Sequence, residues 1–350
     1  MKRLLSLAMV LALGLAACGG GSGEPTPEAE AVLLSYSLSE GDEFSYEVGL
    51  DQHIEMTATG ASSFMGEEVP GNASVDVAGT ATFTHAVSAG PEPGTYEVHI
   101  TGEFADLTVT GDVDGESIDS TDIPDFAQHE PVDVTVLVDE QGNIVPQGPE
   151  GEGPLGDLFG GLGGLGGLSG TNPAPGLDPG QFIGPPLSDE EVAVGDTWTE
   201  EIETPGPGDE PVVTSITSTL SGMEDLDGAE VMVIDSNATT SLIEFDLAEL
   251  FAGMFGAMSA EGATGEDSAE FEGMMDQLRL QITVDDTNSE SRTWFDPADG
   301  VAKQSETNAA TSISMDMNVP DEKTGEMAGL VMDMTLDQDV SYRLISGPEA

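Results

Sequence analysis

The stretches Thr311-Ser312-Ile313-Ser314-Met315-Asp316-Met317-Asn318-Val319 and Leu330-Val331-Met332-Asp333-Met334-Thr335-Leu336 decide the fold of this chain. In both, apolar side chains alternate with polar ones, which is the period of a β-strand with one buried face. Pairing Val319 with Leu330 places Met317 opposite Met332 and Met315 opposite Met334. All the apolar side chains then share one face, and a slip of one residue would break this arrangement. The sequence therefore predicts an antiparallel hairpin with a methionine-rich face.

Shorter alternating runs elsewhere repeat this pattern. Residues 80–87 and 96–104 flank turn residues at 90–94, and residues 212–220 and 231–234 flank an acidic turn at 224–228. Valine occupies every second position over 132–138. We therefore predict a mainly β protein with two related antiparallel, half-barrel-like sheets.

Two segments depart from the alternation. Residues 151–187 are rich in Gly, Leu and Pro, and glycine costs about 1 kcal/mol per residue in a helix, so this segment is predicted to be a linker. Residues 246–280 place Leu247, Leu250, Phe251 and Met254 at the spacing of an amphipathic helix. We expect a small helical insertion there, within the second half of the chain.

The chain also shows signs of an internal duplication. Gly41-Asp42-Glu43-Phe44 is similar to Gly195-Asp196-Thr197-Trp198, and each opens a predicted strand. Val138-Asp139-Glu140-Gln141-Gly142 is similar to Phe295-Asp296-Pro297-Ala298-Asp299-Gly300. The two marks occur in the same order, which predicts related halves over 31–150 and 188–350. Matches this short also arise by chance, so the alternative is two unrelated halves.

The start of the chain carries a sorting signal. Lys2 and Arg3 precede an apolar run that ends in Leu15-Ala16-Ala17-Cys18. This run is shorter than the roughly 20 residues of a membrane-spanning helix, which favours a signal peptide over residues 1–17. A transmembrane helix and a signal peptide with a chance cysteine are the alternatives. The Gly- and Pro-rich residues after Cys18 predict a flexible linker over 18–30.

The run ending at Cys18 resembles the lipobox of bacterial lipoproteins, and further marks resemble an uncharacterised bacterial lipoprotein family. These marks are Gly41-Asp42, Pro185-Pro186, Gly195 to Trp198, and the turn from Asp296 to Gly300. The resemblance covers about residues 31–345. It implies a lipid anchor on Cys18 and a cell-envelope protein that faces outside the cytoplasm, on a membrane that the sequence does not identify. The expected architecture resembles that of the lipoprotein carriers LolA and LppX, which hold acyl chains in a half-barrel.

The charge balance excludes one class of partner. The chain has 67 acidic and 7 basic residues, and without Lys2 and Arg3 its formal charge is about −62. Nucleic acid binding needs cations that displace counterions from phosphates, so we expect no nucleic acid partner. The excess is typical of a solvated acidic surface, and calcium loading is the alternative. We also expect a melting temperature that rises with salt or Ca²⁺.

We find no catalytic motif and predict that the protein is not an enzyme. The chain lacks a Gly-x-Ser-x-Gly elbow, a phosphate-binding loop and His-x-x-His spacing. Acidic pairs are so numerous that an envelope hydrolase stays a remote alternative. If Phe83 pairs with Ile100, His85 faces the core and His99 the surface, so these two histidines do not share a metal site.

Two acidic turns are the candidate metal sites. Each places carboxylates two residues apart beside a glycine, and oxygen ligands on a tight turn suit Ca²⁺. The candidate ligands are Asp112, Asp114, Glu116, Asp225, Asp227 and Glu230. The alternative is a pair of solvated hairpin turns, because Asp and Gly also fit turn backbones. No other cofactor is predicted.

The methionines suggest a second kind of site. The candidate residues are Met315, Met317, Met332 and Met334, together with Met254 and Met258 of the helical insertion. Ordinary core filling explains such side chains, and the functional alternatives are an apolar ligand cavity and a copper(I) site. The leading prediction is a lipid-anchored, non-enzymatic envelope module that binds an apolar ligand or has a structural role. The alternative is a calcium- or salt-dependent structural surface lipoprotein.

Overall fold

The computed structural model describes residues 31–60, 63–64, 67–68, 70–120, 132–143, 145, 184–204, 211–246, 280–285, 287–320 and 327–347. These residues belong to one structural unit. They contain β-strands and no helix, so the predicted mainly β, antiparallel class is confirmed. The predicted signal peptide, Cys18, most of the 151–187 linker, and residues 247–279 of the predicted helical insertion lie outside the described residues.

In the described part of the chain, one antiparallel sheet contains 14 strands, and two very short strands pair separately. The short pair is β2 (Ser63–Phe64) and β3 (Glu67–Glu68). The strands of the sheet that come from the first half of the chain are β1 (Glu43–Gly60), β4 (Asn72–Ala89), β5 (Thr95–Phe104), β6 (Thr108–Val113), β7 (Glu116–Asp119) and β8 (Val132–Asp139). Those from the second half are β9 (Thr197–Thr204), β10 (Val212–Leu226), β11 (Ala229–Thr240), β12 (Ile243–Asp246), β13 (Leu280–Val284), β14 (Thr287–Asp296), β15 (Val301–Pro320) and β16 (Met327–Ser346).

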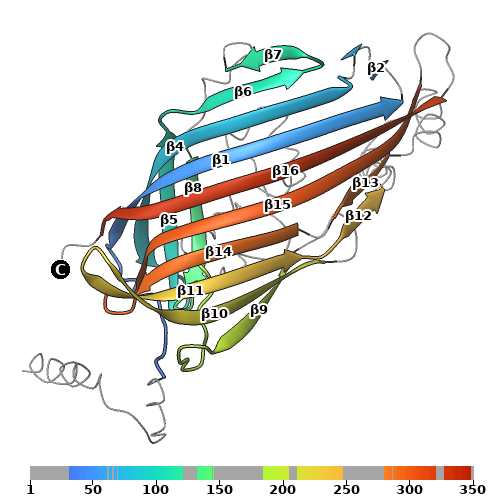
Figure 1. The fold of residues 1–350 in the computed structure, drawn as a ribbon. Helices are drawn as coiled ribbons and strands as arrows, with labels where there is room; N and C mark the ends of the chain where they lie inside the picture. The colour runs from blue at the N-terminus through green and yellow to red at the C-terminus, as the bar shows by residue number, and fades with distance from the viewer. Residues whose placement is uncertain are drawn as a thin grey trace, which may run out of the picture. The chain divides into compact units, whose positions relative to one another are not determined.

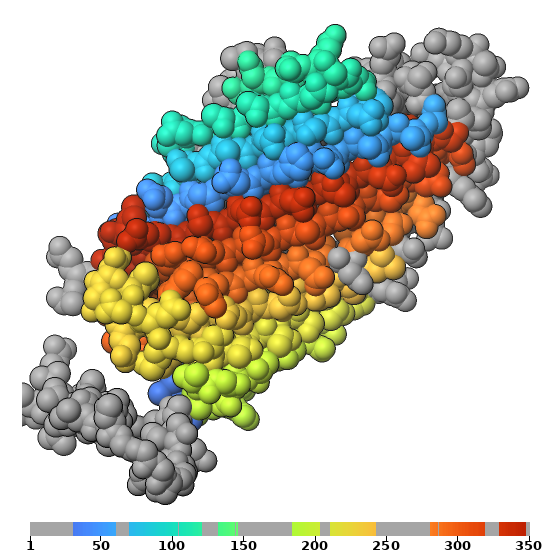
Figure 2. Space-filling view, in the orientation of Figure 1, coloured from blue at the N-terminus to red at the C-terminus, as the bar shows by residue number. Residues whose placement is uncertain are grey.

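The two halves of the chain share a single sheet. The strand order is β7-β6-β4-β1-β16-β15-β14-β11-β10-β9, and β1 joins the halves by pairing with β16 (Figure 1). The first half of β4 pairs with β6 and its second half with β5, which in turn pairs with β8. The later part of β15 pairs with β13. Figure 2 shows the central strands side by side as continuous bands.

The C-terminal hairpin forms as predicted, but its register differs by two residues. Met317 pairs with Leu330, Met315 with Met332, and Ile313 with Met334. Val319 pairs with Ala328 in place of the predicted Leu330, and the strands continue to a Pro320–Met327 pair. A shift of two residues keeps every side chain on its face, so the methionine-rich face is retained.

The hairpin of β4 and β5 shows the same kind of shift. His85 pairs with Ile100 and Phe83 with Gly102, in place of the predicted Phe83–Ile100 pair. His85 is nevertheless buried in the core, and His99 faces outward with its Nε2 2.6 Å from Asp133 Oδ1. The predicted separation of the two histidines is therefore confirmed.

The main core lies on one face of the sheet, which we call the inner face and define by Phe44, Tyr46, Val48 and Leu50 of β1. The cluster also contains residues of β4, β5, β8, β10, β11, β14, β15 and β16. Because inner residues of β5 and β8 share this cluster with residues of β15 and β16, the sheet must curve at this end. In Figure 1, β5 and β8 pass at a steep angle behind β16 and β15.

The similarity of the two halves extends to their hydrogen bonds. Gly41 and Gly195 both have positive φ, at 94° and 100°. The carboxylate of Asp42 accepts a hydrogen bond from the backbone three residues earlier, and that of Asp196 does the same, both at 2.8 Å. The Gly41 amide then donates to the Val87 carbonyl in β4, and the Gly195 amide donates to the Leu220 carbonyl in β10.

Two segments, which we call the lead segments, pack against the end of the inner face that holds the main core. We call this end of the sheet the core end. The lead segments are residues 31–41 and 184–195, which precede β1 and β9. Val32 and Val192 pair in an antiparallel bridge that joins the segments to each other. The Ser37 amide donates to Gly300 in the second half, and the Leu187 amide donates to Gln141 in the first half. Each lead segment is thus tied to the opposite half of the chain.

Candidate functional site

The structure brings the four described candidate methionines together on the inner face. They lie on β15 and β16, at the end of these strands that is far from the main core. Met315 and Met334 pack with Ile282 and Ile313, and Met332 and Met317 pack with Leu330. We call these residues, with Met56, the methionine end. Met254 and Met258 lie outside the described residues.

The methionine end differs from the core end in burial. Met317, Ile313, Ile282 and Leu330 are at most 6% exposed, whereas Met315, Met332 and Met334 are only partly buried. Methionine is flexible and polarisable, so it fills irregular apolar space and adapts to different shapes. This end of the sheet therefore offers an adaptable apolar surface beside a fixed aliphatic base.

Sequence reasoning missed one member of this surface. Met56 pairs with Met334 across β1 and β16, and its side chain is partly buried on the inner face. The signal was present in the chain, because Leu50, Ile54, Met56 and Ala58 follow a period of two. The Gly41-Asp42 mark indicates only the opening of this strand, and β1 extends over 18 residues.

A polar band separates the methionine end from the core end. Gln52 and Gln338 pair across β1 and β16 and are 4% and 7% exposed. Further along the sheet, Ser218 and Ser236 share a buried hydrogen bond of 2.8 Å. The side-chain Nε2 of Gln338 is buried and has no hydrogen-bond acceptor among the described residues. A buried donor without an acceptor lowers stability by about 1–3 kcal/mol. Stability alone therefore does not account for a glutamine at position 338.

The core end holds a small cavity lined by aromatic residues. Its volume is about 20 Å³, which is room for about one water molecule. Tyr36, Tyr46 and His85 line it together with Leu38, Phe44, Val87, Val98, Val301 and Ala302. Burial lowers the pKa of His85 to about 4 and raises the pKa of Tyr46. The cavity is too small for a ligand with an acyl chain.

The predicted calcium ligands lie on two hairpin turns. Asp114-Gly115 and Asp227-Gly228 all have positive φ, between 53° and 89°, which is the geometry of a tight type I′ turn. Asp112 Oδ1 accepts from the Gly115 amide at 2.7 Å, and Asp225 Oδ1 accepts from the Gly228 amide at 3.1 Å. The carboxylates of Asp112 and Asp225 therefore each accept a hydrogen bond from the backbone of their own turn.

The remaining candidates at these turns also do not gather around one point. Asp114 Oδ1 accepts from the Asn72 amide, and Asp227 Oδ2 lies 2.6 Å from Arg343 Nη2. Glu116 is the first residue of β7 and Glu230 is the second residue of β11, and both are exposed. Within the described residues, no three His, Cys, Asp or Glu side chains are grouped so that they could hold a metal ion. Calcium binding stays a prediction.

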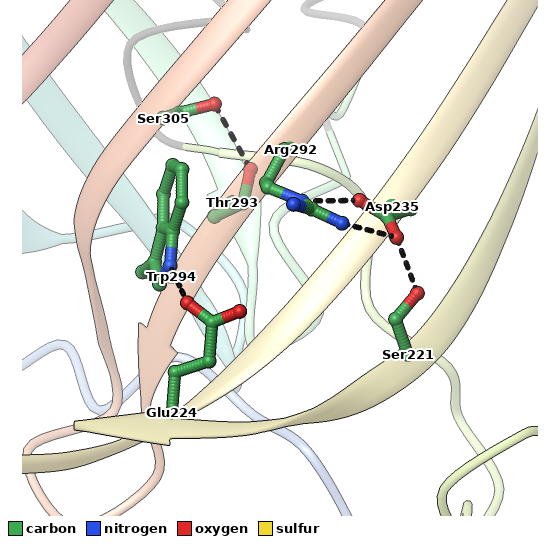
Figure 3. Close-up of polar contacts among 7 residues, drawn as sticks. All are labelled: Ser221, Glu224, Asp235, Arg292, Thr293, Trp294 and Ser305. Atoms are coloured by element: carbon green, nitrogen blue, oxygen red, sulfur yellow. Dashed lines mark hydrogen bonds and ion pairs between the residues drawn. The ribbon is translucent and has the colours of Figure 1, made fainter. Parts of the chain in front are cut away.

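The outer face carries a polar network near the end of β14 (Figure 3). Arg292 donates to both carboxylate oxygens of Asp235, from Nε at 2.7 Å and from Nη2 at 3.1 Å. Ser221 Oγ donates to Asp235 Oδ2 at 2.5 Å, and Trp294 Nε1 donates to Glu224 at 2.9 Å. The hydrogen bond from Arg292 holds the pKa of Asp235 below its usual range.

The other described cations are paired in the same way. Lys303 Nζ lies 2.6 Å from Asp299 and 3.6 Å from Asp296, and Arg343 contacts Asp227. Each Lys or Arg in the described residues therefore has an acidic partner. This leaves no described basic group that is available for an anionic ligand.

Comparisons with known proteins identify no family. No family model matches the chain, and no curated protein matches it. An outer membrane channel from Pseudomonas putida F1 is 10% identical over 93% of this chain and 100% of that chain, with a TM-score of 0.20. OpdQ of Pseudomonas aeruginosa is 6% identical over 87% of this chain and 97% of that chain, with a TM-score of 0.15.

Scores this low carry no argument about fold or function. The described part of the chain also lacks any helix with the length and apolar character needed to cross a bilayer.

Proposed function

We propose that this protein is a lipid-anchored envelope protein that binds an apolar, acyl-chain-like ligand on the inner face of its sheet. One observation carries the proposal: three partly buried methionines, Met315, Met332 and Met334, lie together over a buried base of Ile282, Ile313 and Leu330. At the core end the lead segments pair with each other and the cavity found there is water-sized, which favours the methionine end as the place for such a ligand.

The acidic side chains of the outer face favour the inner face as the binding site for an apolar ligand. Along β1 and β16 the outward side chains include Asp51, Glu55, Asp337 and Asp339, all exposed. Charged groups lose several kcal/mol of hydration when they are covered by hydrocarbon without partners. An apolar ligand therefore favours the inner face.

The lipid anchor is part of this proposal. The motif Leu15-Ala16-Ala17-Cys18 supports it, and acyl chains on Cys18 would hold the acidic protein at a membrane without a basic patch. A Cys18→Ser variant should be found in the soluble fraction after cell disruption, and wild type in the membrane fraction. Membrane attachment of Cys18→Ser would count against the anchor.

Mass spectrometry tests ligand binding. The full-length protein is expressed in a bacterial host, purified from its membrane fraction and analysed under native conditions, and we expect a bound apolar molecule. Met332→Asp places a charge in the site and should remove it. Met223→Asp is the matched control, because Met223 is 49% exposed on the β10–β11 hairpin, and it should retain the molecule. Wild type without a bound molecule, and without uptake of methyl palmitate, would refute the proposal.

A structural role stabilised by salt is the second candidate. Asp51 and Asp339 lie directly opposite each other on β1 and β16, and directly opposed like charges destabilise a sheet. Asp339 accepts a hydrogen bond from Asn308, which eases part of this repulsion. Bound cations would ease it further, whether or not the inner face holds a ligand.

A further inference from the structure

Gln338 lies where the polar band meets the methionine end. It is on the inner face of β16, between Val340 of the core and Leu336, followed by Met334 and Met332. Its side chain is 7% exposed, and its buried Nε2 has no acceptor in the part of the chain that the structure describes. A side-chain amide nitrogen carries two N–H donors. The apolar surface thus begins beside two unused donors.

The neighbours of Gln338 explain what kind of acceptor fits. Its partner on β15 is Ala309, and the next residue across the sheet is Ser289 on β14. These small side chains leave the amide as the largest polar group in that direction. Arg292 and Arg343 lie on the outer face and are paired with Asp235 and Asp227, so a carboxylate ligand would meet no free cation here.

We propose that Gln338 Nε2 donates a hydrogen bond to the carbonyl oxygen of a neutral acyl ester, whose hydrocarbon chain lies along the methionine end. This rests on the proposed function and adds the ligand class and its orientation. The chain extends from Gln338 towards Leu330, a distance of about 27 Å along β16 at about 3.4 Å per residue. An ester fits better than a fatty acid because the protein carries 67 acidic residues against 7 basic ones and would repel a carboxylate.

The test compares three probes of equal chain length on the full-length protein: methyl palmitate, palmitate and hexadecane, each added in the same dilute nonionic detergent. Wild type should bind methyl palmitate most tightly. Gln338→Met keeps the side-chain length but removes the donors, and it should weaken methyl palmitate binding five- to tenfold while leaving hexadecane binding unchanged. Gln281→Met is the matched control, because Gln281 is exposed on β13, and it should behave as wild type.

The outcomes separate this inference from the proposed function. Equal binding of methyl palmitate by wild type and Gln338→Met would overturn the role of Gln338 and leave an apolar site. Tightest binding of palmitate would overturn the preference for an ester. Binding of none of the three probes by wild type would overturn both the inference and the function on which it rests.

A measurement on wild type covers the case in which Gln338→Met does not fold. With ¹⁵N-glutamine labelling, the side-chain amide signal of Gln338 should shift when methyl palmitate is added and should shift much less with hexadecane. The Gln281 signal should stay in place with both probes. An unchanged Gln338 signal at saturating methyl palmitate would overturn the inference.

Discussion

At the scale of single residues, His85 makes the protein sensitive to acid. Burial lowers its pKa to about 4 in the folded state, whereas an unfolded chain has a histidine pKa near 6.5. The unfolded state therefore binds the proton first, and stability falls as the pH drops from about 6.5 to 4. The loss amounts to about 3 kcal/mol. Urea unfolding at pH 7 and pH 4 should show this loss in wild type and not in His85→Phe.

The surface histidine His53 provides a contrast to this prediction. His53 has the opposite sign, because its hydrogen bond to Asp76 raises its pKa. Its contribution is complete below about pH 6.5 and is lost as the pH rises through that raised pKa. If wild type and His85→Phe lose the same stability, buried His85 is not the cause.

The alternation of residues predicts which face a side chain occupies but not its partner. It placed His85 in the core and His99 outside, and it placed Met315, Met317, Met332 and Met334 on one face. Both hairpin registers were nevertheless wrong by two residues. A shift of two keeps the face of every side chain, so only the length of the turn decides between such registers.

At the scale of strands and turns, the two Gly-Asp turns should tolerate substitution poorly. Gly195 has a φ of 100°, and an L-residue with positive φ costs about 1–2 kcal/mol. We expect Gly195→Ala to lower the free energy of unfolding by about that amount, and Gly41→Ala to do the same. Chemical denaturation measures both.

Gly222 provides the matched control for these turns. It lies in β10 without a positive φ, and an added Cβ would meet nothing within 4 Å. Gly222→Ala should therefore leave stability nearly unchanged or increase it slightly. A loss as large as that of Gly195→Ala would show that turn conformation is not the reason.

The equivalence of the two Gly-Asp turns could be predicted from the sequence, but the connection between the halves of the chain could not. The Gly-Asp marks at Gly41 and Gly195 correctly indicated equivalent turns. Two sheets were expected, and one sheet is found, because β1 pairs with β16 along their length. All strands alternate in the same way and offer the same backbone groups, so sequence does not reveal which edges will meet. Missing Met56 has the same origin, since its neighbour Met334 comes from the far end of the chain.

At the scale of the whole molecule, net charge should make stability depend on salt. The formal charge is −60, and like charges on the sheet repel one another less when ions screen them. We expect the melting temperature to rise between low salt and 1 M NaCl, and each 1 kcal/mol gained is worth about 2–4 °C in a domain of about 150–250 residues and less in a larger one.

Two variants locate the source of this effect. Asp51→Asn removes one of the opposed carboxylates of Asp51 and Asp339, so it should raise the melting temperature at low salt and reduce the response to NaCl. Asp42→Asn removes the same charge from a turn where the carboxylate accepts a hydrogen bond, and it should not stabilise. A melting temperature that is flat from low to molar salt would rule out charge repulsion.

The lead segments also decide how the molecule responds to mechanical force. Any pull on the chain ahead of Ala31 enters the sheet through residues 31–41. Their hydrogen bonds run to Val192 and Gly300 in the second half and to Glu140 in the first. The load is therefore shared between both halves before it reaches β1. A protein tethered at its beginning and pulled by flow or by a moving partner would resist at this junction first, while the methionine end remains unloaded.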